Sequence, residues 1–284
     1  MFEPHSQRSQ GIVFNRVAAE YQRSRPAYPE ELVERGCELA GLHRGDHVLE
    51  IGCGTGQLTR SLVARGLRVT AVEPGDQLIE LTRASLTDAG AVNFVHARFE
   101  DAELPGHLAA VFSAAAFHWL DPAISWRRVA AVLAPGGTLA LLGHYGLAEE
   151  RSRADHAELM AALTRNAPEP AADSPALRDL DAIAAGVHER RSDIAAVWAW
   201  LGAHDVEHPD AARLFGEVTL MTVPLLLEQT ADEVNRLMRT TSYYQRLTSA
   251  QREGWERDNV TLYQRLGRPI RSSVVAVLVA AQRR

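Results

Sequence analysis

The stretch from His47 to Gly56, HVLEIGCGTG, decides the fold of this chain. Its first half, His47–Ile51, is a short apolar run that stops at a glycine cluster, as a buried strand does. Apolar residues at helical spacing follow from Leu58 onward. The pattern predicts a strand, a glycine-rich turn and a helix in direct succession.

The same alternation of strands and helices continues on both sides of this stretch. A helical pattern opens at Pro29, before the first strand. After it, further strands are predicted at residues 68–72, 92–95, 109–113 and 138–143. Parallel strands need crossover connections, which are usually helices. The sequence therefore predicts an α/β fold, with a doubly wound, Rossmann-like and mainly parallel sheet.

The pattern changes after Tyr145. The pattern is mostly helical over residues 146–216. We predict strands at residues 218–223 and 273–281, and a pair of helices at residues 231–247 and 249–266. We expect a single domain made of an N-terminal arm (1–35), a cofactor-binding core (36–145), a helical insertion (146–216) and C-terminal strands with the helical pair (217–284). Doubly wound folds bind ligands at the carboxyl edge of the sheet, so the helical segments and the arm are expected to form a lid there.

Two glutamates beside the glycine loop narrow the choice of ligand. Glu50 precedes Gly52, and Glu73 ends the second strand 21 residues after that glycine. An acid in the latter position can accept hydrogen bonds from two ribose hydroxyls. A dinucleotide fingerprint needs a sixth-position glycine, where Gln57 stands, and Glu50 would repel a pyrophosphate. The pattern favours a ligand with a cationic end, such as S-adenosylmethionine, over a nicotinamide dinucleotide.

Five segments of the sequence carry a resemblance to a known family: HVLEIGCGTGQLT (47–59), VEP (72–74), FVHARFEDAELP (94–105), AFHWLDP (116–122) and LAPGGTL (133–139). In these segments the chain resembles the class I S-adenosylmethionine-dependent methyltransferases. The opening FNRVAAEYQRSRPAYP (14–29) and the AFHW box are similar to a branch of small-molecule methyltransferases that includes trans-aconitate methyltransferase. The resemblance implies S-adenosylmethionine as cofactor and S-adenosylhomocysteine as product.

The resemblance also implies roles for individual residues around the cofactor. The methionine part of the cofactor would be lined by Glu50, Gly52, Cys53, Gly54, Gly56 and Gln57, and its chain would also contact Ala115. The ribose would bind Glu73, and the adenine would lie beside Pro74, Phe99 and Glu100. The open side of the site would be closed by Tyr21 and Arg25.

The acceptor side is expected at the same edge of the sheet. Methylation of a hydroxyl or enol releases a proton, and His118, which follows the fourth strand, is the candidate catalytic base. The alternative is that His118 only shapes the floor of the pocket. Adjacent tyrosines on a helix point about 100° apart, so one can face the core and the other a cleft. The candidate substrate-binding residues are Tyr28, Trp119, His144, Tyr243, Tyr244 and Arg246.

Composition excludes several classes of protein. The 284 residues carry a formal net charge of -6, so the chain lacks the overall positive charge that is typical of proteins that bind nucleic acids. All 30 cationic side chains are arginine, which excludes lysine Schiff bases and Walker-type phosphate loops. The two cysteines and the scattered histidines show no metal-binding spacing. No apolar run is long enough to span a membrane and the polar N-terminus lacks a signal core, so we expect a cytoplasmic protein.

These observations lead to one expected function and several alternatives. We expect a methyltransferase that acts on a small molecule, with a carboxylate, hydroxyl or enol oxygen as acceptor. Carbon or nitrogen acceptors, a peptide substrate and a protein that binds S-adenosylmethionine without methylating are the alternatives. The arginine-rich, lysine-free composition, together with the resemblance, suggests a tailoring step in specialised metabolism.

Overall fold

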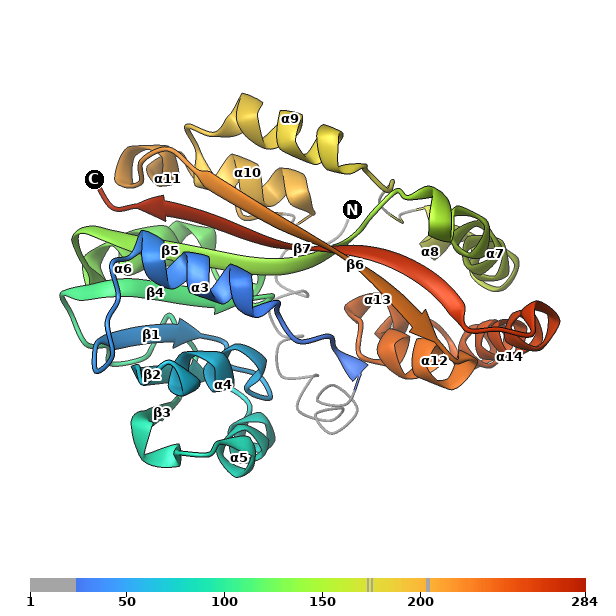
Figure 1. Ribbon diagram of the computed structural model, residues 1–284, viewed down its shortest axis with the longest axis horizontal. Helices are drawn as coiled ribbons and strands as arrows, with labels where there is room; N and C mark the ends of the chain where they lie inside the picture. Colours follow the sequence, from blue (N-terminus) through green and yellow to red (C-terminus); the bar gives the residue numbers. More distant parts are fainter. Residues whose placement is uncertain (1–23, 173, 175, 203–204) are drawn as a thin grey trace.

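The structure, a computed structural model, describes residues 24–172, 174, 176–202 and 205–284. Within these residues seven strands form one sheet in the order β3-β2-β1-β4-β5-β7-β6 (Figure 1). The strands are β1 (His47–Ile51), β2 (Arg68–Glu73), β3 (Val92–His96), β4 (Leu108–Ala114), β5 (Leu133–Gly146), β6 (Thr219–Gln229) and β7 (Ile270–Gln282). The predicted fold, a doubly wound and mainly parallel sheet, is confirmed.

The direction of the strands sets the position of the ligand site. Strands β1 to β5 pair in parallel, whereas β7 runs antiparallel between β5 and β6. The chain winds outward from β1 to β3 and then crosses to the other side of β1 to form β4. Ligands of open α/β sheets bind beyond the carboxyl ends of the strands at such a reversal. The reversal lies here between the ends of β1 and β4.

Helices connect and cover the strands. They are α3 (Glu30–Leu39), α4 (Gln57–Ala64), α5 (Asp76–Ser85), α6 (Pro122–Val132), α7 (Glu150–Asn166), α8 (Pro168–Ala172), α9 (Leu180–Arg190), α10 (Ile194–Leu201), α11 (Pro209–Leu214), α12 (Ala231–Arg239), α13 (Ser242–Gln245) and α14 (Ser249–Leu266), with two short 3₁₀ turns, η2 (Ala89–Ala91) and η3 (Phe117–Trp119).

Alternate residues of the central strands build two cores, one on each face of the sheet. On one face, Ala110 and Phe112 of β4 lie in a cluster with apolar residues of α3 and α4. On the other face, Val111 lies in a cluster with residues of α6, α10 and α11, including the buried Trp126. Strands buried on both sides are continuous apolar runs rather than alternating ones, as β1 is in the sequence. The sheet is therefore a rigid layer that fixes the loops at its carboxyl edge.

The helical insertion does not act as one unit, and this corrects part of the predicted lid. Ile194, Val197 and Trp198 of α10 are fully buried in the core that includes Leu139 and Leu141 of β5. Helix α10 is apolar around most of its circumference, so it is stable only between the sheet and another layer, which α9 provides. The prediction that the insertion, residues 146–216, covers the carboxyl edge is therefore wrong for residues 180–214, because these helices cover a face of the sheet.

The remaining inserted helices gather at the carboxyl edge, to the right in Figure 1. Helices α7, α12, α13 and α14 contact one another there and pack against the extended ends of β6 and β7. The helix predicted over residues 231–247 is interrupted at Thr240. The hydroxyls of Thr240 and Thr241 donate to carbonyls of the preceding turn at 2.6 Å each, a local bond that competes with continued helix.

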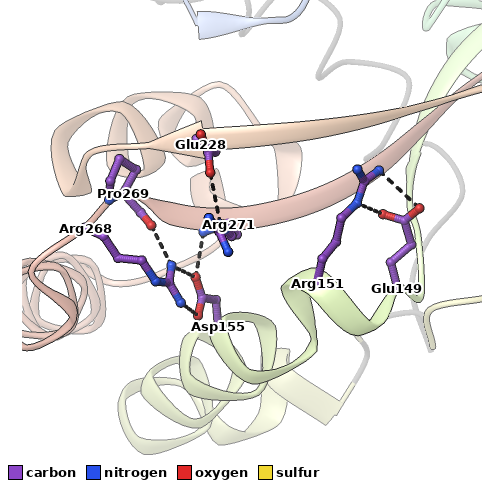
Figure 2. A network of polar contacts seen from close by, with 7 residues as sticks. All are labelled: Glu149, Arg151, Asp155, Glu228, Arg268, Pro269 and Arg271. Carbon is purple, nitrogen blue, oxygen red and sulfur yellow. Dashed lines mark hydrogen bonds and ion pairs between the residues drawn. The ribbon is translucent and has the colours of Figure 1, made fainter.

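An ion pair with a buried carboxylate joins this helical group to the sheet (Figure 2). Asp155 of α7 accepts hydrogen bonds from both terminal nitrogens of Arg268, at 2.7 and 2.8 Å, and from the backbone N–H of Arg271 at 2.7 Å. The Arg271 side chain continues to Glu228 at the end of β6. The Arg268 guanidinium lowers the pKa of Asp155, whose side chain is buried. The network joins α7, β6 and β7 at one point.

Replacing Asp155 with alanine is expected to lower the free energy of unfolding by about 2 kcal/mol, because three hydrogen bonds to a charged group are lost. The paired carboxylate stabilises the fold at neutral pH, and that contribution disappears as the pH falls through the lowered pKa of Asp155. Urea unfolding at pH 7 measures the loss. Glu150→Gln is the matched control on the same helix, since its ion pair with Arg153 is exposed and should contribute less than about 1 kcal/mol. Equal effects of both substitutions would contradict the assignment.

Candidate functional site

The glycine loop between β1 and α4 leaves open space at one position. Gly52 and Gly54 both have positive φ, +70° and +55°. A Cβ added to Gly52 would lie 2.3 Å from the Cβ of Ala116, so this glycine is needed for packing against the loop after β4. A Cβ added to Gly54 would meet no atom within 4 Å among the described residues. The backbone at Gly54 is therefore the place where a ligand can approach closely.

Glu73, at the end of β2, is fixed across this loop. Its two carboxylate oxygens accept the backbone N–H groups of Gly54 and Gly75, each at 3.0 Å. Burial raises the pKa of Glu73, and the two N–H donors counteract that rise. Each carboxylate oxygen can accept a second hydrogen bond. The orientation of Glu73 is therefore fixed by the loop, and its contact with a ribose stays a prediction.

Glu50 lies below the loop and is almost fully buried. The Thr59 hydroxyl of α4 donates to it at 2.7 Å. Burial raises the pKa of Glu50 to about 7, against the Thr59 hydrogen bond and with help from the negative charge of Glu73. Two buried carboxylates near one loop create a negative potential, which stabilises a cationic ligand and disfavours a phosphate.

The loop after β4 completes this part of the site. Ala115 adopts a left-handed φ of +50°, and its N–H donates to the carbonyl of Leu142 on β5 at 2.8 Å. Non-glycine residues in this conformation cluster at binding sites, where the surrounding structure holds them. Phe117 is buried against Trp126, with 4.6 Å between ring centroids, and so anchors the turn η3. That turn carries His118 and Trp119, both partly exposed, to the edge beside Gly52.

The segment after β3 has a different arrangement from the one expected for an adenine pocket. Phe99 is buried in the core, and the Arg128 guanidinium lies 5.5 Å from the centroid of its ring. Glu100 accepts the backbone N–H of Asp121 at 2.9 Å and so holds the start of α6. At the end of β3 itself, the ring of His96 donates to the carbonyl of Pro74, which follows β2, at 3.1 Å. The adenine contacts of Phe99, Glu100 and Pro74 stay predictions.

A second cluster lies at the end of β5. Arg25 of the N-terminal arm donates to the hydroxyl and the carbonyl of Thr240, at 3.1 and 3.0 Å, and so joins the arm to the end of α12. Tyr28 stacks on His144 of β5, with ring centroids 4.6 Å apart and planes 26° apart. The structure thus brings together three of the predicted residues, Arg25, Tyr28 and His144. Tyr21, the fourth one predicted in this region, lies outside the described residues.

The two adjacent tyrosines of α13 point in different directions. Tyr244 is buried, and its hydroxyl donates to Glu256, which also binds Arg239 at 2.6 and 2.8 Å. The ring and hydroxyl of Tyr244 are used inside the helical group, and its predicted role in substrate binding stays a prediction. Tyr243 is partly exposed, and the guanidinium of Arg246 lies 5.7 Å from the centroid of its ring. A role for Tyr243 and Arg246 in substrate binding stays a prediction.

Sequence reasoning missed three threonines that hold the site. Thr59 binds Glu50, Thr240 binds Arg25, and the Thr82 hydroxyl of α5 donates to the carbonyl of Gly54 at 2.8 Å. Thr59 alone has a local signal, since it lies within the first turn after the glycine loop. The other two are distant in sequence from their partners, so no spacing could indicate them.

Glu73→Ala is expected to weaken the binding of S-adenosylhomocysteine by about 1.5–3 kcal/mol, the effect of losing a hydrogen bond to a charged group. Titration calorimetry measures the loss. The control is Glu80→Ala on α5, since that side chain is 74% exposed and should leave the affinity unchanged. Unchanged affinity in Glu73→Ala would remove this carboxylate from the ribose site.

Comparison with known proteins agrees with this geometry. Residues 49–141 match the family described as a methyltransferase domain. An uncharacterized methyltransferase of Mycobacterium tuberculosis is 38% identical over 138 residues, which cover 48% of this chain and 54% of the relative. A ubiquinone biosynthesis O-methyltransferase of Xanthomonas campestris is 37% identical over 101 residues, 34% of this chain and 42% of the relative. The chain thus spans about half the length of the curated relatives it matches.

Solved structures share the fold over most of the chain. A candidate type II methyltransferase from Anaeromyxobacter dehalogenans has a TM-score of 0.56 at 20% identity, covering 91% of this chain and 97% of that one. A SAM-dependent methyltransferase from Thiobacillus denitrificans, in complex with S-adenosylhomocysteine, has a TM-score of 0.51 at 16% identity, covering 96% and 98%. Among the described residues, no helix is long and apolar enough to cross a membrane. Residues 49–141 thus match a methyltransferase domain, and the sheet around them has the same fold as solved S-adenosylmethionine-dependent methyltransferases.

Proposed function

We propose that this protein transfers the methyl group of S-adenosylmethionine to an oxygen atom of a small molecule. One observation carries the proposal: a cofactor cradle, formed by the glycine loop with Glu50 and Glu73, and a cluster suited to an acceptor lie at the same edge of the sheet, with only β4 between their strands. The cradle follows β1 and β2, and the cluster of Arg25, Tyr28 and His144 lies at β5. The loop at Ala115 connects them through its hydrogen bond to Leu142.

The residues of the cradle fit the cofactor. Glu73 would bind the ribose, the backbone at Gly54 would allow the methionine part to approach, and Glu50 would stabilise its positive charge. When bound, S-adenosylmethionine supplies a methyl group that its sulfonium has already activated. The protein then has to align the acceptor and exclude water rather than activate the methyl group.

The acceptor side is suited to a small molecule of anionic or aromatic character. Arg25, held by its two hydrogen bonds to Thr240, contributes a positive charge, and Tyr28 contributes an aromatic face. The net charge of -6 does not suit a nucleic acid. Oxygen as the acceptor atom is supported by the distant similarity to an O-methyltransferase. We place the reaction among the tailoring steps of specialised metabolism.

Two histidines are candidates for the group that takes the proton of a hydroxyl acceptor. His118 is carried by η3 beside the glycine loop, and its ring lies 4.8 Å from that of Trp119. His144 lies on the neighbouring strand, in the cluster with Tyr28. A carboxylate acceptor would need neither histidine, only a cation to orient it.

The test is methyl transfer from isotopically labelled S-adenosylmethionine by the full-length chain. Small phenols, enols, alcohols and carboxylic acids are offered singly, and a lysate of the native host is used in parallel. We expect a labelled product of low mass that contains one additional methyl group. A labelled peptide or RNA would overturn the small-molecule assignment. Binding of S-adenosylhomocysteine without transfer to any fraction would overturn the activity itself.

A further inference from the structure

His144 carries a buried nitrogen that the fold leaves unused. The residue lies near the carboxyl end of β5, two positions after Leu142, whose side chain belongs to the core under α3. Its Nε2 atom is buried and has no hydrogen-bond partner among the described residues. An unsatisfied buried polar atom costs about 1–3 kcal/mol, so its presence needs an explanation.

The other ring nitrogen determines which tautomer is present. The carbonyl of Ala27, in the N-terminal arm, accepts a hydrogen bond from the ring. Because Nε2 has no hydrogen-bond partner among the described residues, we assign the donating N–H to Nδ1. The bond made by one nitrogen sets the protonation of the other in a neutral imidazole. Nε2 therefore presents a lone pair, and the stacked ring of Tyr28 holds its orientation.

The surroundings keep this ring neutral. Burial lowers the pKa of His144 to about 4, the positive charge of Arg25 contributes to the decrease, and the bond to Ala27 opposes it. Arg25 is itself held by its two hydrogen bonds to Thr240. The same positive charge favours negative charge on a ligand atom near the ring. The lone pair of Nε2 is thus available throughout the pH range in which most enzymes work.

We propose that Nε2 of His144 takes the proton of the methyl acceptor, and that the acceptor is therefore a hydroxyl compound rather than a carboxylate. The inference rests on the proposed function. An electron pair of the acceptor oxygen forms the bond to the methyl carbon, the carbon–sulfur bond breaks with its pair remaining on sulfur, and the hydroxyl proton passes to Nε2 and then to solvent. As the oxygen–carbon bond forms, that proton becomes far more acidic, so a weakly basic imidazole suffices.

This arrangement discriminates between acceptor classes. A hydroxyl can donate a hydrogen bond to the lone pair of Nε2. A carboxylate has no proton to donate at neutral pH, and its oxygen lone pairs would be repelled by the lone pair of Nε2. Turning the imidazole into the other tautomer would break its bond to Ala27. Sites built to bind a hydroxyl reject analogues that lack one by about 10⁴-fold or more. Phenols, enols and alcohols are therefore the expected substrates.

The first test reads the tautomer and does not depend on activity. The full-length chain is labelled with ¹⁵N-histidine, saturated with S-adenosylhomocysteine and studied by NMR, with His144→Phe used for assignment. We expect a protonated Nδ1, an unprotonated Nε2, and no titration of His144 between about pH 5 and 8. A protonated Nε2 would overturn the assignment of His144 and leave the proposed methyl transfer intact.

The second test compares acceptors and variants. Substituted phenols and the matching benzoates are offered to the wild type and to His144→Phe, which keeps a ring beside Tyr28. We expect methylated phenols, and in the variant a turnover at least about 10²-fold lower with the affinity for S-adenosylhomocysteine unchanged. Added imidazole should restore part of the turnover of His144→Ala. The turnover of the wild type should not decrease as the pH is lowered to about 5.

Three outcomes of this second test would overturn the inference. The first is methylation of the benzoates in preference to the phenols. The second is a turnover within threefold of wild type in His144→Phe. The third is a loss of about 10²-fold in His118→Asn with none in His144→Phe, which would make His118 the base. If the wild type binds S-adenosylhomocysteine and methylates neither series, the proposed function fails, and the role of His144 with it.

Discussion

Replacement of Gly54 by valine is expected to abolish measurable binding of S-adenosylhomocysteine. Gly54 has a φ of +55°, a conformation that costs residues with a Cβ about 1–2 kcal/mol and β-branched residues more. When the unliganded variant relaxes from this conformation, restoring it on binding costs this strain and weakens binding by about fivefold to thirtyfold. The added side chain would also occupy the open space beside Gly54, in which the structure has no neighbouring atom within 4 Å. Both effects act at the point where the ligand must approach the backbone.

The experiment is titration calorimetry, with circular dichroism to establish that the variant is folded. Gly106→Val is the matched control, because Gly106 is exposed, has no positive φ and has equally open space at its Cβ. It should bind S-adenosylhomocysteine with wild-type affinity. A folded Gly54→Val that binds within tenfold of wild type would show that the cofactor lies elsewhere.

The parts of the site that could be predicted from the sequence are those fixed by neighbours in the chain. The turn after β1 and the acid at the end of β2 belong to a single β-α-β unit, so their spacing fixes their relative positions. The predicted strand His47–Ile51 and the predicted helix 249–266 agree with the structure in both of their bounds. Local periodicity and glycine chemistry determine such elements without help from the rest of the fold.

The parts that could not be predicted depend on contacts between distant segments. Arg25 and Thr240 are 215 residues apart, and no sequence pattern connects the arm to the end of α12. The position of α10 on a face of the sheet was not predictable either, since an apolar helix can be buried against any apolar surface. Glu100 illustrates a third limit: its carboxylate binds the N–H of Asp121, a partner that only the fold brings near. The orphaned nitrogen of His144 likewise emerges only when strands and arm are assembled.

The second large effect is expected at Glu50, where stability and binding should respond in opposite directions. Burial raises the pKa of this carboxyl from 4.5 to about 7, so the folded chain binds more protons than the unfolded chain between these values. Stability therefore decreases as the pH rises through this interval and stays lower above it. The cost of the buried charge above pH 7 is about 3 kcal/mol, the free-energy equivalent of that shift.

Glu50→Gln removes that cost and keeps an oxygen that can accept the Thr59 hydroxyl. We expect the ligand-free variant to be more stable than wild type by about 3 kcal/mol at pH 8, and equally stable near pH 4.5, in urea unfolding. The affinity for the cofactor should fall, because the negative charge that stabilises its cationic end is lost. Glu80→Gln, which alters an exposed carboxyl on α5, should change neither quantity.

Ligand binding should reveal the same charge directly. A cationic ligand favours the ionised form of Glu50, so binding near pH 6.5 should release a proton from the wild type and none from Glu50→Gln. Calorimetry in buffers of different ionisation enthalpy counts that proton. If the two proteins release equal numbers of protons and have the same stability at pH 8, Glu50 carries no charge-dependent role. The expected result is that Glu50→Gln is more stable, releases fewer protons and binds the ligand more weakly. The buried carboxylate then lowers the stability of the ligand-free protein and strengthens ligand binding. Such a cost is expected at a site that holds an unpaired charge until its ligand binds.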